Sequence, residues 1–317
     1  MKADAPSATA YLIATSTLFV AADPLAGRLV PARAAELSAS FVAARSRAAR
    51  WAQDALGRRS ARPFVAALER LTLPGIQLHY ALRKLYLEET ARACLAGGVR
   101  QVVIFGAGYD TLALRLHEQF PAVQFIETDH PATQARKIRT LAASRRGSAP
   151  RPPATNLHFL PVDLTRGRLA ATLLNFPGYR ADAPTLFIAE GLLMYLAPAE
   201  VHALLQTIRD CSGGAPFIRF AFTFMEPRAD GRVNFLAPSR AVDAWLGWRR
   251  EVFKWGVGRA ELPAYLRQRG FVPREVATGE TFRRRYLEPQ SLAHLPLAAG
   301  EYVCVAGDLH DGRGGRP

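Results

Sequence analysis

Short, unbroken runs of apolar residues recur between residues 101 and 308, and each has the length of a β-strand. Runs such as 102–105 show no polar alternation, which is typical of strands buried on both faces of a parallel sheet. The expected strands are 101–105, 123–129, 157–164, 184–191, 216–225, 271–279 and 301–308. Stretches with helical spacing separate them, at 112–120, 130–141, 169–174, 198–210 and 259–270. We therefore predict an α/β fold in which a seven-stranded sheet carries helices on both faces.

The first 98 residues show helical patterns and no strand pattern, so we predict an N-terminal helical annex at 1–98. The sheet domain should then cover 99–310, and the tail 311–317 should be disordered. An apolar run at 11–22 is too short to span a bilayer, and Asp4 interrupts the basic segment that a signal peptide needs. We favour a helix packed on the core over a signal peptide, and we expect no membrane span.

A glycine turn follows the first strand and suggests a nucleotide site. Gly106 and Gly108 lead into the first helix, and the second strand ends on Asp129, an acid that suits ribose hydroxyls. A dinucleotide site has three glycines, but Thr111 takes the third place and Asp110 precedes it. Asp110 would repel a pyrophosphate at the start of the helix. A ligand with adenine and ribose but no phosphate, such as S-adenosylmethionine, avoids that conflict.

Three strands in succession end on an acidic residue. Because ligands bind outside the carboxyl ends of parallel strands, we expect Asp129, Asp163 and Glu190 to line one crevice. Asp163, with the backbone of Leu164, suits the adenine edge, and Glu190 suits a cationic group of the ligand. The methionine carboxylate then needs a cation, and Arg83, on the helix that leads into the first strand, is our candidate.

Five segments of the chain carry a family resemblance: HYALRK, VVIFGAGYDTLALRL, FIETDHP, PVDL and LFIAEGLLMYL. In this order and spacing they resemble the leucine carboxyl methyltransferase family, which includes bacterial relatives of tetracenomycin-type polyketide O-methyltransferases. The resemblance covers 76–205 well and the C-terminal third loosely. It implies a Rossmann-like methyltransferase sheet and an enzyme that acts on a small-molecule acceptor. It also implies a cofactor site for S-adenosyl-L-methionine made by Arg83, Gly106, Gly108, Asp129, Asp163, Leu164 and Glu190.

Composition leaves two other classes of function open. The net charge of +14 invites nucleic-acid binding, but 37 of the 41 basic residues are arginines in short, dispersed clusters without a nucleic-acid-binding motif. The three cysteines lie far apart, so we expect no disulfide framework and no zinc site, and we expect a cytoplasmic protein. A non-catalytic nucleotide or nucleic-acid binder and an NAD(P)-linked oxidoreductase remain as alternatives, and nothing in the sequence indicates the oligomeric state.

The acceptor is not identified by any motif. It could present a carboxylate, which with a pKa near ~4 needs no base, or a hydroxyl such as a phenol with a pKa near ~10, which needs help with deprotonation. His79, His130, His202 and Tyr195 lie near the motifs, but none stands in a recognisable base arrangement, so we assign no catalytic residue. Aromatic residues are dense at 226–258, and they suit either a substrate pocket or ordinary core.

Overall fold

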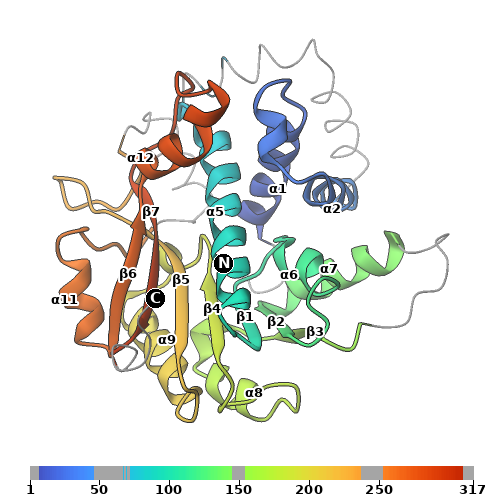
Figure 1. Ribbon diagram of the computed structural model, residues 1–317, viewed down its shortest axis with the longest axis vertical. Helices are drawn as coiled ribbons and strands as arrows, with labels where there is room; N and C mark the ends of the chain where they lie inside the picture. The colour runs from blue at the N-terminus through green and yellow to red at the C-terminus, as the bar shows by residue number, and fades with distance from the viewer. Residues whose placement is uncertain are drawn as a thin grey trace.

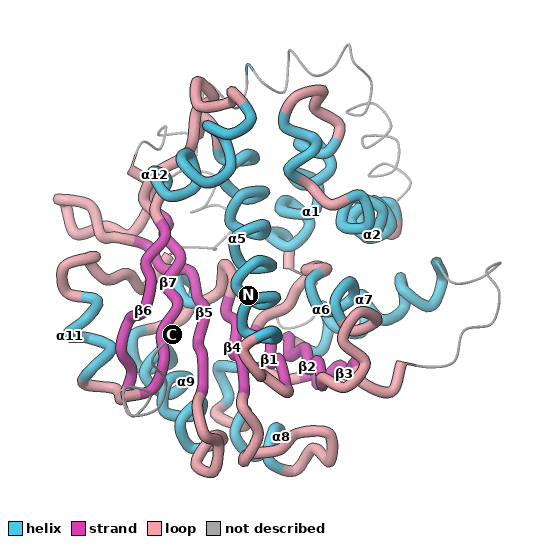
Figure 2. Tube along the Cα trace, in the orientation of Figure 1, coloured by secondary structure: helices cyan, strands magenta, loops and turns pink. Residues whose placement is uncertain are grey.

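The computed structural model describes residues 7–45, 67, 69, 72–144, 154–236 and 253–309. These residues form one seven-stranded sheet in the order β3-β2-β1-β4-β5-β7-β6, which confirms the predicted fold (Figures 1 and 2). The strands are β1 (Gln101–Phe105), β2 (Gln124–Asp129), β3 (Leu157–Pro161), β4 (Thr185–Ala189), β5 (Ile218–Met225), β6 (Phe271–Ala277) and β7 (Glu301–Asp308). The neighbours from β3 to β5 pair in parallel, and β7 lies antiparallel between β5 and β6.

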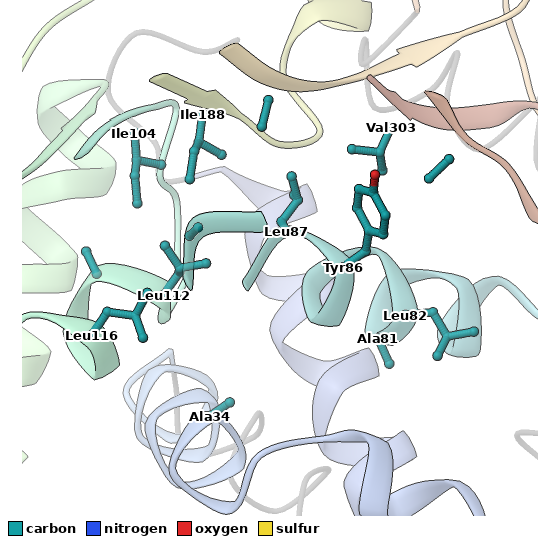
Figure 3. Close-up of a cluster of buried hydrophobic side chains, with 14 of the residues drawn as sticks. Ala34, Ala81, Leu82, Tyr86, Leu87, Ile104, Leu112, Leu116, Ile188 and Val303 are labelled. Atoms are coloured by element: carbon teal, nitrogen blue, oxygen red, sulfur yellow. The ribbon is translucent and has the colours of Figure 1, made fainter. Parts of the chain in front are cut away.

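The two faces of the sheet are buried under different sets of helices. In β1, Val102 and Ile104 belong to one hydrophobic cluster, while Val103 and Phe105 belong to the other, as the alternation of side chains along a strand requires. The first cluster is covered by α5 (Ile76–Ala96), α6 (Leu112–Leu116) and α12 (Gly279–Phe282), and Figure 3 shows part of it around α5. The second is covered by α8 (Leu169–Leu174), α9 (Pro198–Asp210) and α11 (Leu262–Arg267).

Two N-terminal helices lie at the end of the sheet where β1 and β2 finish, the first beside α5 and the second beyond it, toward α6 (Figure 1). They are α1 (Ala8–Ala21) and α2 (Ala32–Ala43), which pack on each other. Tyr109, from the glycine turn, fits between them: its ring lies 4.6 Å from that of Tyr11 and 5.1 Å from that of Phe41. This contact attaches α1 and α2 directly to the predicted nucleotide site. The division of the chain into an annex and a sheet domain stays a prediction, and the tail 311–317 lies outside the described residues.

Several elements end earlier than the sequence pattern suggested. β3 ends at Pro161 rather than residue 164, because Asp163 instead caps a 3₁₀ turn (η2, Leu164–Arg166). α6 ends at Leu116, since Pro121 disfavours a helical conformation at residue 120 and the intervening residues form tighter turns. The remaining long helix, α7 (Pro131–Ser144), packs beside β2, β3 and α2. Among the described helices, none has the length and apolarity needed to cross a bilayer.

Candidate cofactor and acceptor site

A cavity of about 450 Å³ opens at the carboxyl ends of the central strands, with α1 along one side. Its lining contains all of the residues that the sequence assigned to a cofactor: Arg83, Gly106, Gly108, Asp129, Asp163, Leu164 and Glu190. They come from α5 and from the ends of β1, β2, β3 and β4, so the parallel strands bring together residues as far apart as Gly106 and Glu190. The volume is within the ordinary range for a small-molecule site.

The glycine turn needs glycine for both backbone and space. Gly106 and Gly108 have φ angles of +61° and +49°, in the left-handed region that side chains disfavour. A Cβ atom on Gly106 would stand 2.8 Å from Leu192 Cδ1, and one on Gly108 would stand 3.2 Å from Ala10 Cβ. Because both glycines line the cavity, side chains here would crowd the floor on which a ligand would rest.

Asp129 is held by the backbone that surrounds it. Its carboxylate accepts one hydrogen bond from the Gly108 N–H and one, at 2.5 Å, from the His130 N–H. Burial raises the pKa of Asp129, and these two bonds oppose the rise. Among the described residues it has no ion-pair partner, although it lines the cavity. A carboxylate has about four acceptor positions, so two remain for ligand hydroxyls.

Asp163 is engaged mainly with its own turn. One oxygen accepts from the Thr165 N–H at 3.0 Å and from the Thr165 hydroxyl at 2.7 Å, and Arg166 lies 3.1 Å from the other. Partial burial raises the pKa of Asp163. The Thr165 hydrogen bonds and Arg166 lower it by more, so the pKa lies below its usual value. The turn is thereby fixed and holds Leu164 at the cavity wall.

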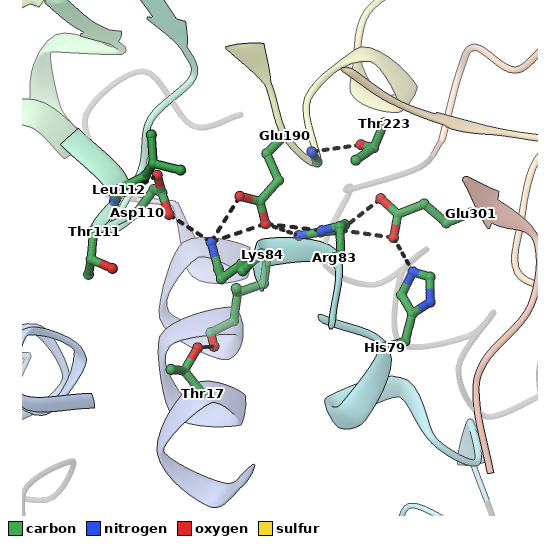
Figure 4. Close-up of polar contacts among 12 residues, drawn as sticks. Thr17, His79, Arg83, Lys84, Asp110, Thr111, Leu112, Glu190, Thr223 and Glu301 are labelled. Carbon is green, nitrogen blue, oxygen red and sulfur yellow. Dashed lines mark hydrogen bonds and ion pairs between the residues drawn. The ribbon is translucent and has the colours of Figure 1, made fainter. Parts of the chain in front are cut away.

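Arg83 is buried and paired with two carboxylates. Its Nε and Nη2 atoms contact Glu190 at 3.0 and 2.8 Å, and Nη1 donates to both oxygens of Glu301, at 2.7 and 2.8 Å (Figure 4). Its guanidinium thus pairs with the buried Glu301 and the partly buried Glu190, as well as lining the cavity. Sequence reasoning missed Glu301, which opens β7 and follows no recognised motif. The role of Arg83 toward a cofactor carboxylate stays a prediction.

Lys84, the neighbour of Arg83 in HYALRK, is a second cation that the sequence analysis did not single out. Its Nζ lies 2.9 Å from Asp110 and 3.0 Å from Glu190, so it bridges the glycine turn and the end of β4 (Figure 4). Burial lowers the pKa of Lys84, but the two carboxylates more than reverse this. Asp110 also accepts from the Leu112 N–H at 3.2 Å, but the N-cap residue of α6 is Thr111, so Asp110 lies one position before the cap.

The family follows from comparison with known sequences. The family model described as leucine carboxyl methyltransferase matches residues 8–209, which is more than half of the chain. The chain belongs to this family. It is therefore an S-adenosylmethionine-dependent methyltransferase, and this confirms the cofactor, the fold and the enzyme class inferred from the glycine turn and the strand ends.

Individual relatives agree with this assignment. A Parafrankia sp. protein, provisionally named an S-adenosyl-L-methionine-dependent methyltransferase, is 32% identical over 69% of this chain and 66% of its own length. A protein of the same provisional name from Mycobacterium marinum is 31% identical over 72% of this chain and 70% of its own length. A solved structure from Thermobifida fusca, provisionally described as a methyltransferase, shares the fold with a TM-score of 0.50 at 16% identity, over 80% of this chain and 88% of that one.

The four side chains considered as bases lie in different surroundings. Two of the four base candidates, His130 and Tyr195, line the cavity. His79 is buried away from the cavity lining, 2.9 Å from Glu301, and His202 is exposed on α9. The structure thus reduces the candidates at the cavity to two, and we assign a base to neither.

In the described parts of the aromatic stretch 226–258, the aromatic side chains lie mainly in the hydrophobic core. Phe235 and Trp255 are buried, and Phe253 packs edge-on against Tyr195 at 5.3 Å. Trp245 and Trp248 lie outside the described residues. The cavity is lined instead by Lys254, between two of these aromatics, which no motif had indicated.

The described residues also contain no group of three or more His, Cys, Asp or Glu side chains placed to hold a metal ion. The three cysteines are free thiols, of which Cys211 and Cys304 are buried. Burial raises the pKa of the Cys211 thiol to about 11 and that of Cys304 to about 12, so neither is activated as a nucleophile.

Proposed function

We propose that this methyltransferase transfers the methyl group to an oxygen, a carboxylate or a hydroxyl, of a small or polyketide-like acceptor. The observation that supports the proposal most is the gathering of the seven cofactor-site candidates around one cavity, whose lining also includes Tyr195, His130 and Lys254. Bound there, S-adenosylmethionine would supply a methyl group on sulfur: the acceptor oxygen gives the electron pair of the new O–C bond, and sulfur keeps the pair of the broken S–C bond.

The residues of the chain contribute binding and alignment to this reaction. Asp129 offers its free acceptor positions to the ribose hydroxyls, and Gly106 and Gly108 leave room for the ligand. We propose that the turn at Asp163 and Leu164 receives the adenine ring, and that Glu190 and Arg83 border the methionine end. Because in-line displacement at a methyl group needs no protein nucleophile, correct placement and a suitable electrostatic environment are the main catalytic contributions.

A methyl-transfer screen tests the proposed acceptor class. The full-length protein is incubated with methyl-labelled S-adenosylmethionine and parallel panels of carboxylic acids, phenols, amines and thiols. We expect label to transfer to members of the first two panels and to be released from carboxyl products by mild base, which cleaves esters but not aryl ethers. Transfer confined to amines or thiols would contradict the proposal.

Cofactor binding is tested separately from turnover. We expect S-adenosylmethionine and S-adenosylhomocysteine to raise the melting temperature, by mass action on the folded state, and NADH to leave it unchanged. We further propose a cytoplasmic location, because three free thiols suit a reducing compartment.

A further inference from the structure

The charges that line the cavity are almost fully paired with each other. Among the described residues, ten Asp, Glu, Lys and Arg side chains line it, five of each sign, and the cations are Arg83, Lys84, Arg115, Arg166 and Lys254. The first four contact Glu190, Asp110, Glu88 and Asp163, respectively. Within the described part of the chain, the Lys254 ammonium has no hydrogen-bond or ion-pair partner. Among the described lining residues, it is therefore the cation without a counterion from the protein, and its charge is available to an anionic ligand.

The backbone around Lys254 is firmly anchored, although its side chain is exposed. Its N–H donates to the carbonyl oxygen of Met194 at 2.7 Å, in the 3₁₀ turn that follows β4. Phe253 on one side packs against Tyr195, and Trp255 on the other is only 5% exposed. The Lys254 side chain is solvent-exposed and also lines the cavity, and its backbone is fixed. It therefore lies at the cavity mouth. Ligands that enter the cavity there therefore encounter a localised positive charge.

We propose that Lys254 determines acceptor specificity by binding an anionic group of the acceptor other than the oxygen that is methylated. This inference rests on the proposed function. The cofactor carries a single anionic group, which the proposed function places near Arg83 and Lys84, whose side chains are 2% and 22% exposed, and not near the exposed Lys254. The exposed position of Lys254, next to Tyr195, instead suits a ligand that extends out of the cavity.

The chemistry of methyl transfer explains why the reacting oxygen is not the group bound. A carboxylate or phenolate loses its negative charge as the O–C bond forms. An ammonium paired with that oxygen would therefore stabilise the ground state more than the transition state and would slow the reaction. An ammonium paired with a second anionic group keeps its interaction throughout and aligns the acceptor. The acceptor class is thus an aromatic or polyketide-like compound that carries a carboxylate in addition to the methylated oxygen.

Lysine labelling tests the binding step without requiring turnover. The chain has four lysines, of which Lys84 and Lys137 are tied in buried or partly buried ion pairs, so Lys254 can be followed by mass spectrometry after a brief pulse of N-hydroxysuccinimidyl acetate. The probes are salicylate, 4-hydroxybenzoate and phthalate, each matched with its neutral amide, on protein saturated with S-adenosylhomocysteine. At four times its Kd, a bound carboxylate should slow acetylation of Lys254 about fivefold, and its amide should not.

The outcomes of this labelling are distinct. Protection by at least one carboxylate, but not by its amide, supports the proposal. Equal protection by acids and amides, or protection by none of the probes, overturns it. Protection by S-adenosylhomocysteine alone also overturns it, because Lys254 would then belong to the cofactor site.

Variants of Lys254 connect binding with specificity. For a hydroxybenzoate that is methylated, Lys254→Met should raise KM about tenfold with little change in kcat. Lys254→Arg should restore most of the affinity. Neither substitution should change the KM for the matching amide. Arg267→Met removes one exposed positive charge on α11, away from the cavity, and controls for net charge. If the hydroxybenzoate is methylated equally well by Lys254→Met, the inference fails and the proposed function stands. Protection of Lys254 without methylation of any oxygen acceptor supports anion binding and contradicts the proposed function.

Discussion

Arg83 and Glu301 lie 218 residues apart and form an almost completely buried ion pair, with side chains 2% and 1% exposed. Nη1 of Arg83 donates to both carboxylate oxygens, and Nε2 of His79 lies 2.9 Å from the second oxygen. The pair joins α5 to the start of β7, while the other edge of the same guanidinium contacts Glu190 at the end of β4. One arginine therefore fixes three elements around the cavity, and its substitution should affect the fold before it affects a ligand.

Arg83→Ala should destabilise the protein strongly, because it leaves the buried carboxylate of Glu301 without its arginine counterion and removes one of the two cations that contact Glu190. We expect a loss of about 3–5 kcal/mol in the free energy of unfolding, measured by urea denaturation. Arg83→Lys keeps the charge but loses the forked geometry, so its free energy of unfolding should lie between those of the wild type and Arg83→Ala. Arg267→Ala, on the exposed face of α11, should change stability by less than about 0.5 kcal/mol. A loss below about 1 kcal/mol for Arg83→Ala would show that Lys84 compensates for it.

The stability of the protein should fall in mild acid because of Glu301. Burial alone would raise the pKa of Glu301, but Arg83 and His79 lower it to about 2, from an ordinary value of 4.5. The unfolded chain binds the Glu301 proton more tightly than the folded protein does. The contribution of Glu301 to stability is therefore complete above pH 4.5 and is lost as the pH falls toward 2. The difference corresponds to roughly 3 kcal/mol.

Glu301→Gln isolates that contribution. The variant should be less stable than the wild type at pH 7, and the gap between the two unfolding free energies should narrow as the pH falls from 5 to 3. Urea unfolding at several pH values measures it. Parallel curves for the two proteins, separated by a constant gap, would mean that Glu301 does not titrate in this window.

The sequence predicted the sheet well because each strand is short, apolar and bounded by turn residues. The position of Asp129 at a carboxyl end then follows from parallel packing, and this is why the candidate cofactor residues could be proposed without a structure. Local patterns were less reliable at the ends of elements, as β3 and α6 show, because Asp163 and Pro121 redirect the chain within one turn.

The sequence could not reveal which charges neutralise one another. The sequence pattern around Glu301 predicts only a strand. The antiparallel position of that strand, β7, beside β5 is what brings Glu301 to Arg83. Lys254 lies in an aromatic segment without periodic structure, and it is placed at the cavity by tertiary contacts such as the backbone hydrogen bond to Met194 and the packing of Phe253 on Tyr195. Lys84 was adjacent to a named residue, and the acidic strand ends were a signal that a second cation was needed.

Gly106→Ala should weaken cofactor binding, and Gly167→Ala provides a matched control. Both glycines have nearly equal positive φ angles, +61° and +64°, so each alanine should cost about 1–2 kcal/mol of stability. A Cβ atom at Gly167 meets nothing within 4 Å, whereas one at Gly106 stands 2.8 Å from Leu192, inside the cavity lining. We expect the Kd for S-adenosylhomocysteine to rise about tenfold for Gly106→Ala alone. Equal affinities of the two variants would place the ligand away from the turn.

Asp129→Ala should weaken binding of S-adenosylhomocysteine by about 1.5–3 kcal/mol, because a partly buried carboxylate that accepts two ribose hydroxyls is lost. The same substitution removes the acceptor for the Gly108 and His130 N–H groups, so a looser turn could produce a similar loss. A thermodynamic cycle with the 2′,3′-dideoxy analogue separates the two causes. If the carboxylate binds the ribose, calorimetry should show that Asp129→Ala changes the affinity for the analogue by less than about 0.5 kcal/mol. An equal loss for both ligands would mean that Asp129 acts by holding the glycine turn.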